Sequence, residues 1–192
     1  MILGITGGTG CGKTTLLETI RQLGGLVLDC DAIYHELLKT DREMLAAIGA
    51  RFPGTVDEKG LDRKKLGALV FADQAALLEL NAITHSAVKR EVLRRLEANS
   101  RLAAIDAIGL FESGLDKLCK LTVAVTAPVE LRVARLMARD SIPEDYARKR
   151  IAAQRSQEEF SRLCDFTLEN SGTVEQFQEK CLAFLRKQGI MG

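Results

Sequence analysis

A glycine-rich segment near the amino terminus has the residue types and spacing that bind phosphate. Residues 7–14, GGTGCGKT, match the pattern G-x-x-x-x-G-K-[ST] and are called the glycine loop below. Glycines let the backbone turn so that its N–H groups surround an anion at the start of a helix. Lys13 would reach the β- and γ-phosphates of a nucleotide, and the Thr14 hydroxyl would bind Mg²⁺. The residues expected to contact the nucleotide here are Gly8, Gly10, Cys11, Gly12, Lys13, Thr14 and Thr15.

Two carboxylates follow the next apolar run, and they offer the chemistry that a hydroxyl acceptor needs. Asp29 and Asp31 come directly after residues 26–28, a run short enough for a buried strand. Phosphoryl transfer to a hydroxyl needs a carboxylate that accepts the proton and orients the attack. Parallel sheets bind their ligands at the carboxyl ends of the strands. Either aspartate could supply this carboxylate, or one or both could cap the helix that starts near Ala32, and for Asp29 the cap is the favoured interpretation.

The elements around these residues form a β-α-β pattern, which implies a parallel sheet. Residues 1–6 and 26–28 are short apolar runs, and the helical spacing of apolar side chains begins at Lys13. Residues from about 40 to 100 are largely helical by pattern, with one loop at 52–62. Further strands are predicted at 102–105, 121–125 and 166–168, and helices at 129–138, through an Arg-rich stretch to about 162, and from about 173.

The composition excludes several classes of protein. The 192 residues are 46% hydrophobic and 28% charged, ordinary for a globular domain and too apolar for disorder. No stretch approaches the ~20 apolar residues that span a bilayer, and residues 1–8 lack the features of a signal peptide. With 27 basic and 26 acidic side chains the formal charge is +1. We therefore expect a cytoplasmic protein, a monomer or small homo-oligomer, with no nucleic-acid or membrane partner.

Nucleotide binding leaves three classes of protein open: switch GTPases, ATPase motors and small-molecule kinases. The Asn-Lys-x-Asp motif that binds guanine does not occur, which argues against a GTPase. Residues 102–106 look like the apolar strand and aspartate that hold magnesium in motors. Asp106 fits that role and that of a plain strand-end residue equally well.

The chain resembles one family of kinases, the dephospho-coenzyme A kinases, in an ordered set of motifs. These motifs follow the family's order over nearly the whole chain, which makes the set far more specific than the glycine loop alone. They are GITGGTGCGKT at 4–14, LDCD at 28–31, LNAITH at 80–85, LFESGL at 110–115, RLMARD at 135–140, RIAAQ at 150–154, and the terminal segment from Asp165 through Asn170-Ser171-Gly172.

The resemblance implies both a reaction and an architecture. The reaction is transfer of the ATP γ-phosphate to the ribose 3′-hydroxyl of dephospho-CoA, with Mg²⁺, as the last step of coenzyme A synthesis. The architecture is an α/β three-layer P-loop fold with a parallel sheet, in one domain over 1–192. Its parts are a nucleotide core (about 1–38 and 101–192), a helical CoA-binding insertion (about 40–100) and a lid (about 138–157). The alternatives are a kinase of a nucleoside or nucleotide and, less favoured, an ATP-hydrolysing regulatory or binding protein.

The resemblance also assigns arginines and one glutamine to the nucleotide. Asp31 matches the residue that acts as base on the hydroxyl. Arg139, where the lid would begin, is expected to stabilise charge on the transferring phosphoryl group. Arg135 could contact the nucleotide or pair with a carboxylate on the helix surface. Arg150 and Gln154 are expected on one helical face, at i and i+4, as a second nucleotide contact.

Four further residues match family motifs, with less specific expectations. Asn170 and Gly172 would lie near the adenine through backbone contacts, or would form an ordinary turn. His85 could contact the substrate or make a structural hydrogen bond. Glu112 could hold a water on magnesium, or simply cap a turn.

The chain departs from the family pattern at a few positions. Cys11 stands where serine is usual, and a depressed thiol pKa is expected there because a helix begins beside it. The arginine that commonly follows the D-x-D motif is absent near Tyr34-His35. The five cysteines form no C-x-x-C pair, so neither structural zinc nor a disulfide framework is expected.

A substitution at Asp31 tests its expected role directly. Asp31→Asn removes the proton acceptor and keeps the shape of the side chain. It should lower turnover far more than it weakens ATP binding, when steady-state rates are compared with nucleotide affinity. Unchanged turnover would remove Asp31 from the mechanism.

Overall fold

The computed structural model describes residues 1–98 and 101–190. The strands are β1 (Ile2–Thr6), β2 (Leu26–Asp29), β3 (Val56–Asp57), β4 (Gly60–Leu61), β5 (Ala103–Asp106), β6 (Leu121–Thr126) and β7 (Phe166–Glu169). The helices are α1 (Lys13–Gln22), α2 (Cys30–Thr40), α3 (Arg42–Arg51), α4 (Arg63–Phe71), α5 (Gln74–Glu97), α6 (Val129–Asp140), α7 (Glu144–Ala152), α8 (Gln157–Leu163) and α9 (Val174–Lys187), with one 3₁₀ turn at Asp116–Leu118.

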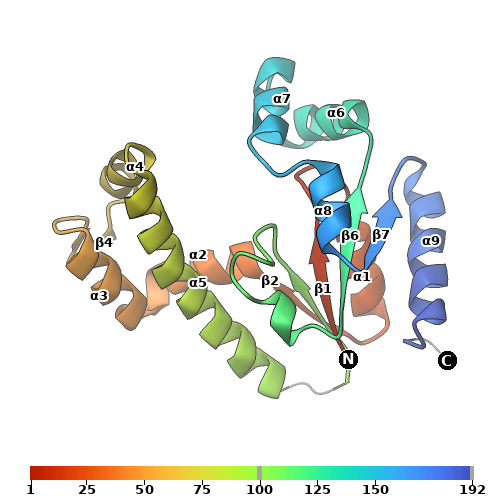
Figure 1. The fold of residues 1–192 in the computed structure, drawn as a ribbon, viewed down its shortest axis with the longest axis horizontal. Coiled ribbons are helices and arrows are strands. Elements are labelled where there is room, and N and C mark those ends of the chain that lie inside the picture. Colours follow the sequence, from red (N-terminus) through yellow and green to blue (C-terminus); the bar gives the residue numbers. More distant parts are fainter. Residues whose placement is uncertain (99–100, 191–192) are drawn as a thin grey trace. The chain divides into compact units, whose positions relative to one another are not determined.

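The main sheet has five strands in the order β2-β5-β1-β6-β7 (Figure 1). β1 pairs in parallel with β5 and with β6, and β6 pairs in parallel with β7. The three central strands β5, β1 and β6 are short and mostly buried, as expected where helices cover both faces, whereas the edge strand β7 is largely exposed. The predicted α/β fold is confirmed, and the glycine loop follows the carboxyl end of the central strand β1.

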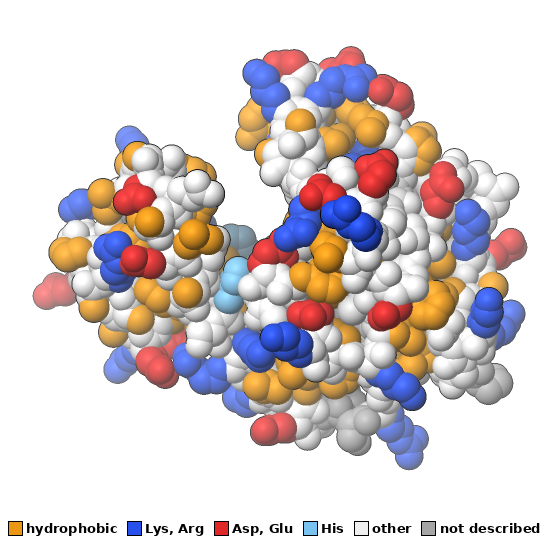
Figure 2. All heavy atoms as spheres, viewed as in Figure 1, with side chains coloured by type: hydrophobic (Ala, Val, Ile, Leu, Met, Phe, Trp, Pro, Cys, Tyr) orange, Lys and Arg blue, Asp and Glu red, His pale blue; other side chains and the backbone are white. Residues whose placement is uncertain are grey.

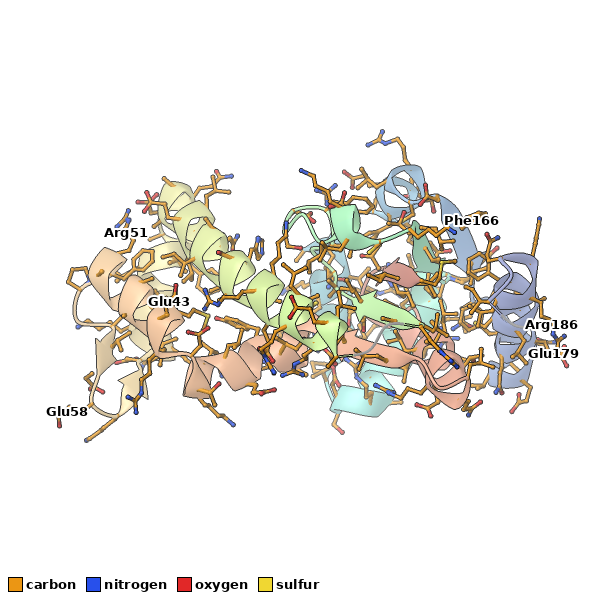
Figure 3. All side chains as sticks on the ribbon, turned by 90° about the horizontal axis from the view of Figure 1, so that it is seen from below. Glu43, Arg51, Glu58, Phe166, Glu179 and Arg186 are labelled. Carbon is orange, nitrogen blue, oxygen red and sulfur yellow. The ribbon has the colours of Figure 1, made fainter. Side chains whose placement is uncertain are left out.

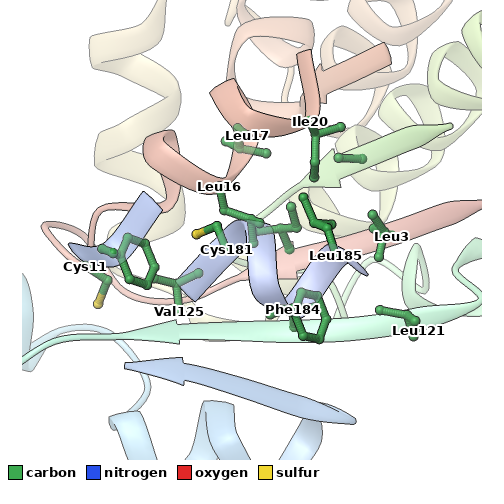
Figure 4. Close-up of a cluster of buried hydrophobic side chains, with 14 residues drawn as sticks. Leu3, Cys11, Leu16, Leu17, Ile20, Leu121, Val125, Cys181, Phe184 and Leu185 are labelled. Carbon is green, nitrogen blue, oxygen red and sulfur yellow. The ribbon is translucent and has the colours of Figure 1, made fainter. Parts of the chain in front are cut away.

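The core of the sheet region packs α1 and α9 against one face of the sheet (Figure 4). Apolar side chains recur on each helix at the spacing that places them on a single face. Those of α1 are Leu16, Leu17 and Ile20, and those of α9 are Phe177, Cys181, Phe184 and Leu185, all buried. Thr173 and Gln176 form a capping box at the start of α9, which confirms the predicted beginning of that helix.

Helices α6 and α7 form a smaller packed pair. Val133 and Leu136 of α6 are buried against Ala147 of α7, with Ile142 and Ile151 beside them. The residue between the helices, Ser141, takes a left-handed conformation (φ 53°) that ends α6. This pair has its own small apolar cluster, separate from the one under α1 and α9.

Contacts divide the chain into two compact units, residues 1–28 with 99–192 and residues 29–98. Within the second unit, α2, α3 and α4 all pack on the long helix α5. Aspartates cap all four helices: Asp29, Asp41, Asp62 and Asp73. The predicted cap is confirmed, because Asp29 Oδ1 accepts a hydrogen bond from Ala32 N at 2.9 Å, although the helix already begins at Cys30.

One element of the second unit was not expected from the sequence. Residues 52–62, predicted as a loop, contain the antiparallel hairpin β3–β4. Each strand has only two residues, too few for an alternating pattern to be recognised. Glu58 lies at the turn of this hairpin (Figure 3).

Basic and acidic side chains are mixed over the surface. Lys and Arg side chains are interspersed with Asp and Glu over the visible face (Figure 2), consistent with the near-zero net charge. Among the described residues, no helix is both long and apolar enough to cross a membrane.

Candidate active site

The glycine loop joins β1 to α1 and leaves the first amides of that helix uncapped. Gly12 occupies the N-cap position in a left-handed conformation (φ 85°), and no side chain caps the helix. The first N–H groups of a helix have no partner inside it, and together they attract an anion. The start of α1 therefore has the donors that a phosphate needs.

A buried arginine holds the middle of the loop from α6. Arg132 is only 2% exposed, and its Nε donates to the carbonyl oxygen of Thr9 at 2.9 Å. The Thr9 amide in turn donates to Gln154 Oε1 at 2.7 Å. An ideal Cβ on Gly8 would clash with Arg132 Nη2, so a side chain at this position would have to displace the guanidinium.

Two further side chains bind the next carbonyls of the loop. Arg135 Nη1 donates to the Gly10 oxygen at 3.2 Å, and Asn170 Nδ2 donates to the Cys11 oxygen at 2.9 Å. Arg135 Nη2 also donates to Asn170 Oδ1 at 3.2 Å, which joins the two. Asn170 is fixed by its own backbone, whose N–H donates to the oxygen of Thr126, the last residue of β6. With these carbonyls engaged outside the loop, its remaining amides can face a ligand.

Arg132 is a site residue that the sequence analysis missed. Its Nη2 is buried and makes no hydrogen bond within the described part of the chain, and no carboxylate there pairs with it. A buried charge without a counter-ion is unfavourable, so an anion at the loop would stabilise this arginine. The signal was its helical spacing from Arg135 and Arg139, at i, i+3 and i+7 on α6.

Lys13 and Asp106 lie together at the carboxyl ends of two neighbouring strands. Lys13 Nζ donates to Gly7 O at 3.0 Å and lies 3.9 Å from Asp106 Oδ1. Both side chains are less than one-fifth exposed. Thr14, on the first turn of α1, is exposed. Hydroxyl and carboxylate oxygens are ligands that Mg²⁺ accepts, so Thr14 and Asp106 could serve a metal bound with nucleotide.

The expected pairing of Arg150 with Gln154 on one helical face is wrong. Helix α7 ends at Ala152, and the chain turns before Gln154 reaches the glycine loop. Arg150 instead donates to Asp140 Oδ2 at 2.6 Å. Arg139 also donates to Asp140, through Nε and Nη2 at 2.7 and 2.9 Å. Hydrogen bonds from Arg139 and Arg150 hold the pKa of the Asp140 carboxyl well below its usual range.

Three other residues that the sequence analysis singled out make the following contacts. Asn170 meets the glycine loop through its side chain, because its backbone N–H continues the pairing with β6. Glu112 neither caps a turn nor stands alone: it accepts a hydrogen bond from Arg155 Nε at 2.6 Å. Gly172 packs against the side chain of Gln176, at the start of α9.

The depressed pKa expected for Cys11 is wrong. Its side chain is buried (1% exposed), and burial raises the pKa of the thiol. The positive charges of Arg132 and Lys13 oppose this shift without cancelling it. The start of α1 therefore does not make Cys11 a reactive thiolate.

Two predicted residues belong to the second unit. Asp31 is exposed on the first turn of α2, and because Asp29 caps that helix, Asp31 is not needed for capping. His85 is half-buried within α5.

The chain is similar in sequence to one family of proteins. The family model described as Dephospho-CoA kinase matches residues 1–176. A Dephospho-CoA kinase from Bacillus licheniformis is 35% identical over 181 residues, covering 91% of this chain and 90% of that protein. One from Anaeromyxobacter dehalogenans is 39% identical over 185 residues, covering 93% and 88%.

Solved structures of this family and of related folds are also similar to this chain. The protein TT1252 from Thermus thermophilus matches with a TM-score of 0.82 and 33% identity, over 100% of this chain and 98% of that one. Dephospho-CoA kinase from Campylobacter jejuni matches with a TM-score of 0.69 and 26% identity, over 99% and 98%. Shikimate kinase from Acinetobacter baumannii shares the fold alone (TM-score 0.53, 20% identity, 99% and 95% covered).

Replacing Arg132 tests whether the loop depends on it. Arg132→Met keeps the apolar stem and removes both the charge and the hydrogen bond to Thr9. We expect the Kd for ATP, measured by calorimetry, to rise roughly tenfold to a hundredfold. Arg21→Met, on the exposed side of α1, should bind ATP as the parent protein does. Parent-like affinity in a folded Arg132→Met variant would show that the loop does not need this arginine.

The raised pKa of Cys11 predicts slow alkylation. Because a raised pKa keeps the group as a thiol, the iodoacetamide rate at Cys11 should reach half its maximum above the usual pH of about 8.5. Peptide mass spectrometry across a pH series measures this rate for Cys11 alone. A midpoint below that of the same cysteine in the urea-unfolded chain would contradict the effect of burial.

Proposed function

Because this chain belongs to the dephospho-CoA kinase family, we propose that it transfers the γ-phosphoryl group of ATP to the ribose 3′-hydroxyl of dephospho-CoA, giving CoA and ADP. One observation carries the nucleotide half of this proposal: the glycine loop, whose carbonyls are bonded from outside by Arg132, Arg135 and Asn170. The acceptor half rests on the match to the family over residues 1–176.

The nucleotide phosphates bind to the loop amides and the first turn of α1. Lys13 faces the β- and γ-phosphates, in place of its present contact with the Gly7 carbonyl. Arg132 and Arg135 add positive charge behind the loop. Because these groups are already fixed by the fold, little reorganisation is needed as charge moves during transfer.

Magnesium is the metal that these residues fit. The Thr14 hydroxyl and the Asp106 carboxylate are hard oxygen donors, and the described residues include no cluster of three or more His, Cys, Asp or Glu side chains. Few protein ligands are typical of Mg²⁺, which keeps waters and nucleotide oxygens around it. When bound, the ion supplies charge neutralisation at the phosphates.

Asp31 accepts the proton of the 3′-hydroxyl and orients its attack on the γ-phosphorus. Two observations support this role: Asp31 is exposed on α2, and the capping of that helix falls to Asp29. His85 and Glu112 are proposed as further contacts to the acceptor.

Residues 138–157 act as a lid over the bound nucleotide. The Asp140 carboxylate forms ion pairs with both Arg139 and Arg150 at the end of α6. Exchange of this carboxylate for phosphate oxygens would bring Arg139 to the transferring group. Closure would also exclude water, which prevents hydrolysis of ATP.

Acceptor-dependent ADP release from Mg·ATP tests this function. Dephospho-CoA should stimulate release, with CoA appearing in equal amount, and Lys13→Ala serves as the blank. Nucleosides and nucleotides are assayed in parallel as alternative acceptors. ADP release independent of any acceptor would favour an ATP-hydrolysing protein instead, and a larger response to a nucleoside would contradict the choice of dephospho-CoA.

A further inference from the structure

Residues 154–157, called the return segment below, lead from the end of α7 into α8 (Figure 1). Arg155 Nε donates to Glu112 Oε1, in the loop after β5, at 2.6 Å. Gln157 Oε1 accepts a hydrogen bond from the amide of Ala127, the residue after β6, at 2.7 Å. Helix α8 itself packs on β6. The return segment is therefore fixed to the sheet region at points other than the glycine loop.

Thr9 of the glycine loop is bonded from both ends of the proposed lid. Its amide donates to Gln154 Oε1 at 2.7 Å, and its carbonyl oxygen accepts from Arg132 Nε at 2.9 Å. Arg132 belongs to α6, which leads into residues 138–157, and Gln154 belongs to the return segment near their end. The two bonds fix the peptide group before Thr9 and the one after it. A change in the position of either end of the lid therefore acts on the backbone of Thr9.

The bond to Gln154 also affects which amides of the loop can bind phosphate. It engages the Thr9 amide outside the loop. The Cys11 amide donates to Gly8 O at 3.3 Å, inside the loop. This leaves the amide of Gly10 and those at the start of α1 to face a ligand. A glutamine oxygen accepts the bond from Thr9 without adding a negative charge near the phosphates.

Gln154 and Arg132 approach the loop on the same side. A Cβ added to Gly8 would contact both Arg132 Nη2 and Gln154 Oε1. Arg132 is buried, and its Nη2 has no hydrogen-bond partner among the described residues. Because the Thr9 amide can only donate, the oxygen of Gln154 must face it. The partial negative charge of this oxygen therefore lies on the same side of the loop as the buried cation.

We propose that Gln154 is a positioning residue for phosphoryl transfer, through which the glycine loop and the lid hold each other in place. The inference rests on the proposed function and adds a residue to it. Gln154 acts through Thr9, a role that differs from the direct nucleotide contact expected from the sequence. With this bond intact, the closed lid brings Arg139 to the transferring group and excludes water. Without it the lid closes less accurately, and water competes with the acceptor for the γ-phosphoryl group.

The fate of the γ-phosphoryl group tests this role. The readout is the ratio of inorganic phosphate released to CoA formed from Mg·ATP and dephospho-CoA, called the hydrolysis ratio below. Gln154→Ala removes the acceptor of the Thr9 bond. It should lower kcat for CoA formation roughly threefold to tenfold and raise the hydrolysis ratio by a similar factor. Gln157→Ala removes a hydrogen bond of the same kind that does not reach the loop. It should lower the melting temperature to a similar extent and keep the parental hydrolysis ratio.

Gln154→Glu separates positioning from direct contact with phosphate. A carboxylate still accepts the bond from the Thr9 amide, but it has no donor for phosphate and adds a negative charge. Hydrogen exchange of the Thr9 amide, measured by NMR without nucleotide, should be slow in the parent and in Gln154→Glu, and at least about tenfold faster in Gln154→Ala. Gln154→Glu should therefore keep a low hydrolysis ratio, even though its charge raises the KM for ATP.

The outcomes distinguish this role from the proposed function. A parental hydrolysis ratio in folded Gln154→Ala would overturn the positioning role, while parental conversion of dephospho-CoA upholds the function. A ratio as high in Gln154→Glu as in Gln154→Ala would overturn it in favour of phosphate contact, and an equal rise in Gln157→Ala in favour of general destabilisation. A folded parent protein that forms no CoA would overturn the function and this inference with it.

Discussion

A backbone loop can bind phosphate through its amides only if its carbonyl oxygens are engaged elsewhere. Here the carbonyls of Thr9 and Cys11 accept hydrogen bonds from Arg132 and Asn170, and Arg135 reaches both Gly10 and Asn170. These donors come from α6, which follows β6 in the chain, and from the residue after β7, the strand that pairs with β6. The sheet order β1-β6-β7 therefore places these donors beside the loop. Because they bind its carbonyl oxygens from outside, the loop amides remain available to a ligand.

A buried cation without a carboxylate partner lies where the nucleotide phosphates are expected to bind. On the surface, arginines such as Arg148 and Arg90 are paired with acidic side chains. At the glycine loop, Arg132 is buried and has no such partner among the described residues.

Local rules predicted the parts of the fold that are encoded locally. The glycine loop, the parallel sheet and the Asp29 cap all follow from residue types within a few positions of one another. Contacts between distant segments could not be predicted this way: Arg132 meets Thr9 across 123 positions, and Asn170 meets Cys11 across 159. From its spacing, Gln154 was predicted to lie on a helix. In the structure the chain turns after α7, and this turn brings the Gln154 side chain to the glycine loop. For Cys11, burial decided the pKa, and burial is a property of the folded chain.

The central claim is that outside contacts hold the glycine loop ready before nucleotide arrives. The most direct test is ¹⁵N relaxation of the amides of residues 8–12 in the nucleotide-free protein. A loop held in this way should have order parameters near the value of about 0.85 found in rigid backbone, similar to β1, and Asn170→Ala should lower them. Values below about 0.6 in the parent protein, rising only when Mg·ADP is added, would show that the ligand and not the fold organises the loop.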